Sequence, residues 1–449
     1  MSSEQPWAGR RLHLIGLAGA GMSGLALLAR ALGARVSGSD PNDSPYLGPV
    51  RAAGIEALVG PWDPVNVPAE AEVFYGTAVT ADNPERAVAR ERGQPELHRS
   101  VLLGQLAARR KVLAVAGTHG KTTTASMAAV ALRASGLEPG YLIGGTLGAT
   151  GRNAEWGGGE WLVVEADESD RSLLVLSAEI AVLLNAELDH HATFGSRLEV
   201  DAVFREYLAR ARRAVITARP ELVALAGATP VESVVAPQAQ LDGDGARFTW
   251  RGHAVSLSVP GEHNASNAVA ALEACRLAGA DPAAAAAGLA GFRGSARRFE
   301  RLGVAESGAQ IYDDYAHHPT EVSATLRAAR TLAPSRLVAV LQPHLFSRTR
   351  ALARDFGVAL AEADVICVLD VYHARERAED HPGVSGRLVA EAAADAAPGR
   401  TIAWLPVFAD ARRFLDSELR KGDLCVLLGA GDIDGLGREL VVGEAGGMA

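Results

Sequence analysis

Short apolar runs alternate along the whole chain with longer segments of helical composition, and glycine-rich or polar turns separate them. Runs such as Leu12–Ile15, Val112–Ala116 and Leu337–Leu341 have the length and composition of buried parallel strands. The alanine-rich stretch Ala283–Ala287 reads better as a helix than as low-complexity sequence. Strands that alternate with helices predict an α/β protein built on mostly parallel sheets.

Two changes of pattern divide the chain, whose 449 residues exceed one ordinary domain. The basic run Arg109-Arg110-Lys111 precedes a new strand, and a glycine- and arginine-rich stretch occupies residues 291–298. We therefore predict three domains, at 1–108, 109–294 and 295–449. The first and third have the pattern of Rossmann-like α/β domains, and the central one that of a P-loop ATPase-type parallel sheet.

The clearest motif, GTHGKTTT at 117–124, follows the strand at 112–116 and precedes a helix predicted over Ala125–Ser135. A glycine-bounded loop between a strand and a helix points backbone N–H groups at a phosphate chain, while a lysine reaches the outer oxygens and a hydroxyl binds Mg²⁺. The first glycine of the standard pattern would fall on Val115, so a glycine turn with a surface lysine remains the alternative. The residues predicted to bind a nucleoside triphosphate are Gly117, Thr118, Gly120, Lys121, Thr122 and Thr123.

A second glycine-rich turn, GLAGAGMSG at 16–24, lies between the strand at 12–15 and a predicted helix, Leu25–Leu32. A further strand then leads to Asp40, whose carboxylate could accept a hydrogen bond from a ribose hydroxyl or a base. This βαβ pattern is typical of sites for a dinucleotide or a nucleotide pyrophosphate. Taken alone it suggests an NAD-dependent oxidoreductase, but that reading leaves Lys121 and Glu165 without a role.

Further polar groups follow other predicted strands. EADESD at 165–170 and NAELDHH at 185–191 place carboxylates and imidazoles where an α/β sheet holds a metal and a nucleotide, although such clusters are often only solvated turns. Asn264 and Asn267 open a long helix and could face an adenine edge or simply cap the helix. Arg348, which follows the strand at 337–341, favours recognition of a carboxylate.

Composition narrows the functional classes. A formal net charge of −9 gives no basic surface for nucleic acid, and no apolar run is long enough to span a bilayer, so neither a nucleic-acid nor a membrane partner is expected. The three cysteines, Cys275, Cys367 and Cys425, are dispersed in apolar segments, which predicts reduced core thiols and a cytoplasmic location.

Seven motifs, in the same order, resemble those of the Mur ligases of peptidoglycan synthesis, and the resemblance covers nearly the whole chain. They are GTHGKTTT (117–124), EADESD (165–170), NAELDHHATFG (185–195), GEHNASN (261–267), RRFE (297–300), DDYAHHPTE (313–321) and QPHLFSRTR (342–350). The resemblance implies that the first domain holds a UDP-linked substrate, the central one ATP, and the third the amino acid. It also implies that the carboxylate of UDP-N-acetylmuramate takes the γ-phosphate, and that the acyl phosphate reacts with L-alanine.

The resemblance also assigns roles to residues. It implies that Thr122, Glu165 and His190 hold Mg²⁺, with His190 serving a second ion. The catalytic residues it implies are Lys121, His190, His344 and Arg348. Asn264, Asn267, Arg298 and Asp314 are implied for ATP, and Gly19, Gly21, Met22, Ser23, Asp40, Tyr315 and Tyr372 for the other substrates.

Three features depart from the family pattern: Ala18 replaces a common glycine, Leu345 replaces a common basic residue, and no lysine lies between Lys121 and Lys421. The last excludes the carbamylated lysine of other Mur ligases, so His190 gains importance. A ligase that recycles a whole tripeptide onto the same UDP-sugar is the nearest alternative. A nucleotide-gated binding protein is less favoured, because the Lys, carboxylate and His set is complete. We expect a monomer or a homodimer.

Overall fold

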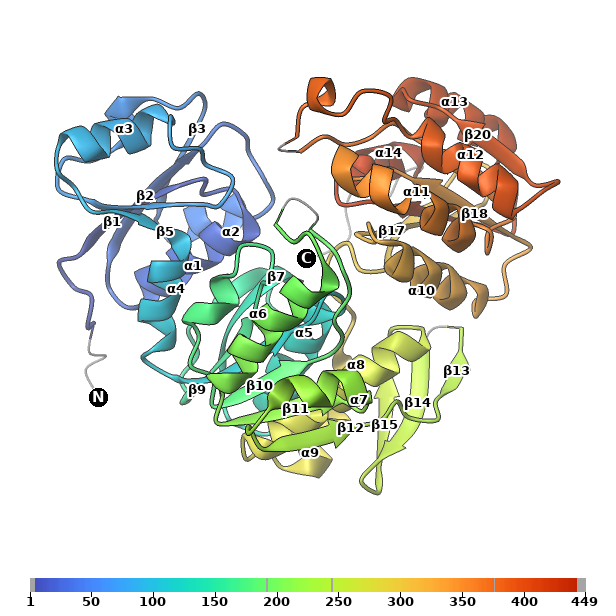
Figure 1. The fold of residues 1–449 in the computed structure, drawn as a ribbon. Helices are drawn as coiled ribbons and strands as arrows, with labels where there is room; N and C mark the ends of the chain where they lie inside the picture. Colours follow the sequence, from blue (N-terminus) through green and yellow to red (C-terminus); the bar gives the residue numbers. More distant parts are fainter. Residues whose placement is uncertain (1–4, 191–192, 244, 375, 442–449) are drawn as a thin grey trace.

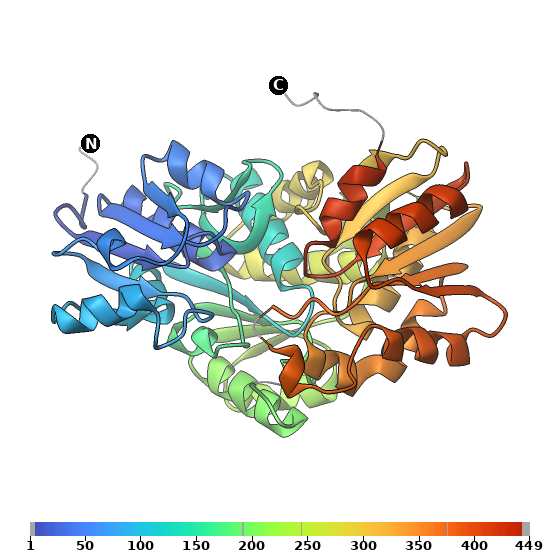
Figure 2. The ribbon, with the colours of Figure 1, turned by 90° about the horizontal axis from the view of Figure 1, so that it is seen from above.

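The computed structural model describes residues 5–190, 193–243, 245–374 and 376–441 (Figure 1). It has three α/β units, each with its own mostly parallel sheet, which confirms the predicted fold class. Seen from above, the N-terminal and C-terminal units lie on opposite sides of the central unit (Figure 2). The boundaries at 108/109 and 294/295 remain a prediction.

The N-terminal unit is a five-stranded parallel sheet in the order β3-β2-β1-β4-β5. Its strands are β1 (Arg11–Ile15), β2 (Arg35–Asp40), β3 (Glu56–Val59), β4 (Glu72–Tyr75) and β5 (Glu96–His98). Its helices are α1 (Ala20–Ala31), α2 (Leu47–Ala52), α3 (Pro84–Glu91) and α4 (Arg99–Ala107), with a 3₁₀ turn at Pro64–Asn66. Helix α1 begins within the glycine-rich turn, five residues before the predicted Leu25.

The central unit has a seven-stranded sheet in the order β12-β11-β10-β6-β9-β7-β8, in which only the β7–β8 pair is antiparallel. The strands are β6 (Lys111–Ala116), β7 (Gly140–Leu147), β8 (Arg152–Glu155), β9 (Trp161–Glu165), β10 (Ile180–Leu183), β11 (Arg213–Thr217) and β12 (Val231–Val234). The helices are α5 (Lys121–Ala134), α6 (Arg197–Ala209), α7 (Pro220–Val223), α8 (Glu262–Leu277) and α9 (Pro282–Gly288), with 3₁₀ turns at Ser172–Val175, Ala224–Ala226 and Leu289–Gly291. A small antiparallel sheet follows β12, with strands β13 (Gln240–Asp242), β14 (Gly245–Trp250) and β15 (His253–Leu257).

The C-terminal unit is a six-stranded sheet in the order β16-β17-β21-β18-β19-β20, with β16 antiparallel to β17. The strands are β16 (Glu300–Val304), β17 (Gln310–Asp314), β18 (Arg336–Leu341), β19 (Val365–Val368), β20 (Thr401–Trp404) and β21 (Asp423–Leu428). The helices are α10 (Pro319–Arg330), α11 (Phe346–Leu360), α12 (Arg387–Ala396), α13 (Phe408–Glu418) and α14 (Ile433–Leu440), with a 3₁₀ turn at Ala378–Asp380.

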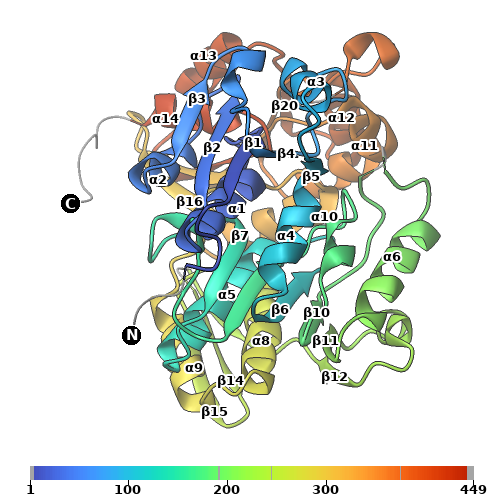
Figure 3. The same ribbon diagram turned by 90° about the vertical axis from the view of Figure 1, so that its left-hand side faces the viewer.

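The N-terminal and central units share one apolar core, because helix α1 packs directly against β7 and β8 (Figure 3). Gly24 makes this approach possible, since a Cβ there would lie 2.3 Å from Cδ1 of Leu142. The side-chain amide of Asn153 donates to the Ala20 carbonyl (2.6 Å) and to Oγ of Ser23 (2.9 Å). The C-terminal unit has separate cores on the two faces of its sheet.

The three cysteines are buried and form no disulfide, as predicted. Burial raises the pKa of the Cys367 thiol to about 12, which keeps it protonated. Among the described residues, no helix combines the length and the apolar character needed to cross a membrane.

Candidate active site between the central and C-terminal units

The loop between β6 and α5 carries the predicted phosphate-binding motif. Helix α5 begins at Lys121, four residues before the predicted start, because Gly120 turns the chain in the left-handed region at a φ of 82°. A Cβ at Gly120 would lie 2.7 Å from Oδ1 of Asn267, so this loop also approaches α8 closely. The backbone N–H groups of the first turn of α5 thus lie close to the carboxyl end of the buried strand β6.

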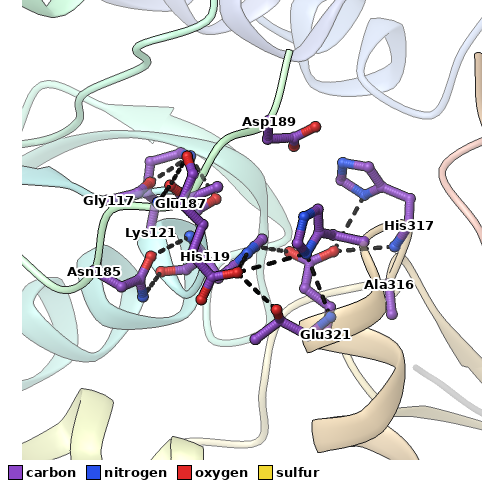
Figure 4. Close-up of polar contacts among 12 residues, drawn as sticks. Gly117, His119, Lys121, Asn185, Glu187, Asp189, Ala316, His317 and Glu321 are labelled. Atoms are coloured by element: carbon purple, nitrogen blue, oxygen red, sulfur yellow. Dashed lines mark hydrogen bonds and ion pairs between the residues drawn. The ribbon is translucent and has the colours of Figure 1, made fainter. Parts of the chain in front are cut away.

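Lys121 points back into this loop (Figure 4). Its ammonium donates to the carbonyls of Gly117 (2.6 Å) and Thr118 (3.0 Å) and lies 3.0 Å from Oε2 of Glu168. Burial alone would lower the pKa of Lys121, but the nearby carboxylates, Glu168 foremost, outweigh it and raise that pKa. The side chain therefore stays a cation, paired with Glu168 at the start of α5.

Thr122 and Glu165, two of the residues predicted to hold Mg²⁺, lie in contact. The Thr122 hydroxyl donates to Oε1 of Glu165 over 3.0 Å, and the Gly144 N–H donates to Oε2 over 2.6 Å. A hydroxyl and a carboxylate fixed on adjacent elements supply the oxygen ligands that Mg²⁺ prefers. The residues present therefore fit a magnesium ion.

A second group of possible ligands lies beside the first. Asp167, Glu168 and His190 each offer a ligand atom within 4.8 Å of the others, and Nε2 of His190 is 3.5 Å from Oε1 of Glu168. This set fits a cation, although an imidazole is an unusual ligand for Mg²⁺. Asp167 and Glu168 were not singled out from the sequence, even though the EADESD motif contains them.

A cavity of about 470 Å³ opens between the central and C-terminal units. Its lining includes six residues predicted to bind ATP: Gly120, Thr123, Asn264, Asn267, Arg298 and Asp314. Asn264 is buried, and its amide donates to the Pro260 carbonyl over 2.7 Å. Three lining residues that sequence reasoning missed are His263, Arg219 and Phe292. His263 stands in the GEHNASN motif, whereas Arg219 and Phe292 carried no comparable signal.

The linker into the C-terminal unit is fixed beside this cavity. Arg297 donates from Nε to Oδ2 of Asp313 (3.0 Å) and from its terminal nitrogens to two carbonyls of the loop after β21. Asp314 accepts from the backbone N–H groups of Phe299 (2.9 Å) and Ala316 (2.8 Å). Burial raises the pKa of Asp314 to about 6, and this network orients the linker next to Arg298.

The residues predicted for the amino acid gather at the carboxyl end of β18. The Nε of Arg348 donates to Oδ1 of Asp189 over 2.7 Å, and a terminal nitrogen lies 3.0 Å from Nδ1 of His344. Tyr372 stacks on His344 with ring centroids 5.8 Å apart. The ring of Tyr315 lies instead under Arg298, and the ring centroid is 5.1 Å from the guanidinium carbon of Arg298. Asp189, which the sequence reasoning did not assign, thus occupies one side of the predicted alanine-binding guanidinium.

Of the residues of the N-terminal glycine-rich turn that were predicted to bind substrate, two lie at the N-terminal end of α1 and two are buried in the core. Gly19 precedes the first residue of α1, and a Cβ at Gly21 would lie 3.1 Å from the guanidinium of Arg99. Met22 and Ser23 are buried in the packing of α1, so their side chains face the core.

Asp40 holds the turn itself. It accepts from the Ala18 N–H over 3.0 Å and from the Asn42 N–H over 3.0 Å, and burial raises its pKa. Arg99 was missed by the sequence reasoning. It bridges to Asp170 of the EADESD motif over 2.6 Å. Binding of a UDP group by Gly19, Gly21, Met22, Ser23 and Asp40 stays a prediction.

Comparison with known proteins identifies the architecture. Three family models match in sequence order: the Mur ligase catalytic domain over residues 11–111, the Mur ligase middle domain over 115–275, and the Mur ligase glutamate ligase domain over 297–431. A UDP-N-acetylmuramate–L-alanine ligase of Mycolicibacterium smegmatis is 42% identical over 468 residues, covering 96% of this chain and 94% of that protein. The chain belongs to the Mur ligase family. The ligase of the same name from Kineococcus radiotolerans is 44% identical to this Mur ligase, covering 96% of this chain and 95% of that protein.

Solved structures agree with this assignment. The UDP-N-acetylmuramate–alanine ligase MurC of Thermotoga maritima superposes on this Mur ligase with a TM-score of 0.82 at 26% identity, covering 96% of this chain and 98% of that one. A murein peptide ligase from Psychrobacter arcticus gives a TM-score of 0.72 at 25% identity, with the same coverage. The resemblance derived from the seven motifs is therefore confirmed.

Proposed function

We propose that this Mur ligase joins L-alanine to the lactyl carboxylate of UDP-N-acetylmuramate, giving UDP-N-acetylmuramoyl-L-alanine, ADP and phosphate in peptidoglycan synthesis. The contact of Thr122 with Glu165, one residue from the half-buried Lys121 and beside the interdomain cavity, carries the proposal. Relatives named for this activity, 42% and 44% identical, support it. When bound with Mg²⁺, ATP supplies the phosphoryl group that activates the carboxylate.

The chain's own residues divide the work. Lys121 places a fixed positive charge where phosphate oxygens gain negative charge, and Thr122 with Glu165 would hold Mg²⁺ there. Asn264, Asn267, Arg298 and Asp314, at the cavity wall, would bind the nucleotide.

On the other side of the carboxylate cluster, His190 would hold a second cation. Arg348, oriented by Asp189, would receive the alanine carboxylate next to His344. Bringing these groups together from two units positions the amine against the activated carbon. We further propose that the enzyme works in the cytoplasm, where its three buried cysteines would stay reduced, as a monomer or homodimer.

Phosphate release tests the proposal. The purified enzyme would receive ATP and Mg²⁺ with UDP-N-acetylmuramate and, in turn, L-alanine, glycine, L-serine or the stem tripeptide. We expect release that requires the UDP-sugar and is fastest with L-alanine. Preference for the tripeptide would assign the enzyme to recycling, and absence of release in every combination would contradict a ligase.

A Lys121→Ala variant should lose this activity, while Lys111→Ala should keep it. Lys111 lies on the protein surface, where its ammonium is 2.9 Å from Oε2 of Glu160 and 5.8 Å from the ring centre of Trp161. Comparing phosphate release by the two variants shows whether activity depends on the cation at Lys121 or falls when any nearby lysine is removed.

A further inference from the structure

His119, inside the phosphate-binding loop, touches both units that form the cavity (Figure 4). Its Nδ1 lies 3.1 Å from Oε1 of Glu321 on α10, and its Nε2 lies 3.4 Å from Oε2 of Glu187 after β10. Its backbone is held separately, because the His119 N–H donates to Oδ1 of Asn185 (2.8 Å) and its carbonyl accepts from that amide (3.0 Å). The backbone therefore belongs to the central unit, while the side chain reaches the C-terminal one.

Glu187 receives a second contact from α10. The Thr320 hydroxyl donates to Oε2 of Glu187 over 2.7 Å. Glu321 is oriented for its role, since its other oxygen accepts from the His317 N–H over 3.0 Å. His119, Glu187, Thr320 and Glu321, here called the latch, thus form one chain of contacts across the interface.

All four latch residues line the nucleotide cavity. His119 is next to Gly120 and two residues from Lys121, in the loop predicted to bind phosphate. Its imidazole reaches Glu321 in the first turn of α10, so one side chain connects this loop to the C-terminal unit.

We propose that His119 is a positioning residue that latches the C-terminal unit onto the phosphate-binding loop through Glu187 and Glu321, so that nucleotide binding and closure reinforce each other. The proposal rests on the ATP binding of the proposed function. Removing either carboxylate leaves the largely buried His119 with one acidic partner in place of two, which disfavours the closed arrangement.

The charges around His119 make the hydrogen bonds of the latch depend on pH in the alkaline range. Burial opposes protonation of His119, but Glu321 and Glu187 outweigh it and raise its pKa to about 9. Of the other groups that face the latch, His318 packs on His119 with a lowered pKa, while His317 and Arg298 face Glu321. Only the imidazolium donates from both nitrogens, so the latch is complete below the ordinary histidine pKa and is lost as pH rises through about 9.

A double-mutant cycle tests the latch. His119→Asn, Glu321→Gln and the double variant would be compared for the affinity of AMP-PNP by calorimetry, and for compaction on AMP-PNP binding by small-angle X-ray scattering. We expect each single variant to bind about tenfold more weakly, and the double variant no more weakly than either. Glu362→Gln is the matched control. Glu362 accepts a 3.1 Å hydrogen bond from Arg327, which lies on α10 as Glu321 does, but this contact stays within the C-terminal unit. The Glu362→Gln variant should therefore bind AMP-PNP as the wild type does.

The pH dependence gives a readout that a merely structural contact would not move. AMP-PNP affinity of the wild type should fall as pH rises through about 9, and the midpoint should move to lower pH in Glu321→Gln. Additive effects in the cycle, or equal midpoints in the two proteins, would overturn the latch. A wild type that fails to bind AMP-PNP would instead contradict the proposed function.

Discussion

Arg348 and Asp189 form a buried ion pair that joins the C-terminal and central units, with Nε 2.7 Å from Oδ1. Burial raises the pKa of Asp189, but the Arg348 guanidinium outweighs this and holds it well below its usual range. The pair fixes the plane of the guanidinium before any substrate arrives. Any carboxylate that Arg348 binds must therefore share the guanidinium with Asp189.

Asp189→Asn should strongly impair the reaction. Removing one partner of a buried pair costs about 3–5 kcal/mol, and here the cost falls on the closed arrangement, so kcat/KM for L-alanine should drop about 100-fold or more. Asp201→Asn is the control, because Arg197 meets Asp201 with the same Nε–Oδ1 distance of 2.7 Å on the protein surface. It should change stability by at most about 0.5 kcal/mol. Equal effects of the two variants in steady-state kinetics would refute this account of the buried pair.

Gly120→Ala should weaken ATP binding more than Gly136→Ala does. Both glycines have positive φ, 82° and 73°, so each alanine pays about 1–2 kcal/mol of backbone strain. Only at Gly120 would the new Cβ also meet Asn267, at 2.7 Å, whereas nothing lies within 4 Å at Gly136. We expect KM for ATP to rise about tenfold in the first variant alone. Unfolding in urea would check that both variants stay folded under the assay conditions, so that the difference in KM reports on the site.

Thr122→Val should raise the Mg²⁺ concentration needed for half-maximal activity by roughly tenfold. The substitution keeps the shape of the side chain and removes the hydroxyl that contacts Glu165. Thr124→Val, on the same helix, removes a buried hydroxyl without a hydrogen-bond partner among the described residues. Its Mg²⁺ titration should match that of the wild type, and a similar shift in both would argue against a metal role for Thr122.

Glu187 should contribute stability that acid removes. His119 and Thr320 donate to its carboxylate and lower its pKa to about 2. Because the folded pKa lies below the unfolded one, this contribution is complete above the ordinary glutamate pKa and declines as pH falls towards about 2. The difference in urea stability between wild type and Glu187→Gln should therefore shrink between pH 5 and pH 3 (about 4.3 being the ordinary glutamate value). A difference that is constant over this range would contradict the assigned cause.

Contacts within one stretch of strand, loop and helix could be predicted from the sequence. Lys121 and Thr122 sit at a motif that fixes their geometry locally, and Glu165 ends the neighbouring strand of the same sheet. Pairs that cross between units could not be predicted. Arg348 and Asp189 are 159 residues apart, and His119 and Glu321 are 202 apart, so their contacts depend on how whole sheets meet.

Helix starts were predicted too late for a related reason. Apolar periodicity marks the buried face of α1 and α5, but the first turn of each is set by the glycine loop before it. Ala18, which replaces a common glycine, lies in the first of these loops. In the structure its backbone N–H is bonded to Asp40.

The shared core of the N-terminal and central units has a consequence for synthesis on the ribosome. Ser23 and Asn153, which meet at this interface, are 130 residues apart. At ordinary elongation rates, α1 waits on the order of ten seconds before β7 and β8 are made. Its small-residue face, with Gly24 at the centre, stays uncovered during that interval, so this face is open to non-native contacts until the central unit has been made.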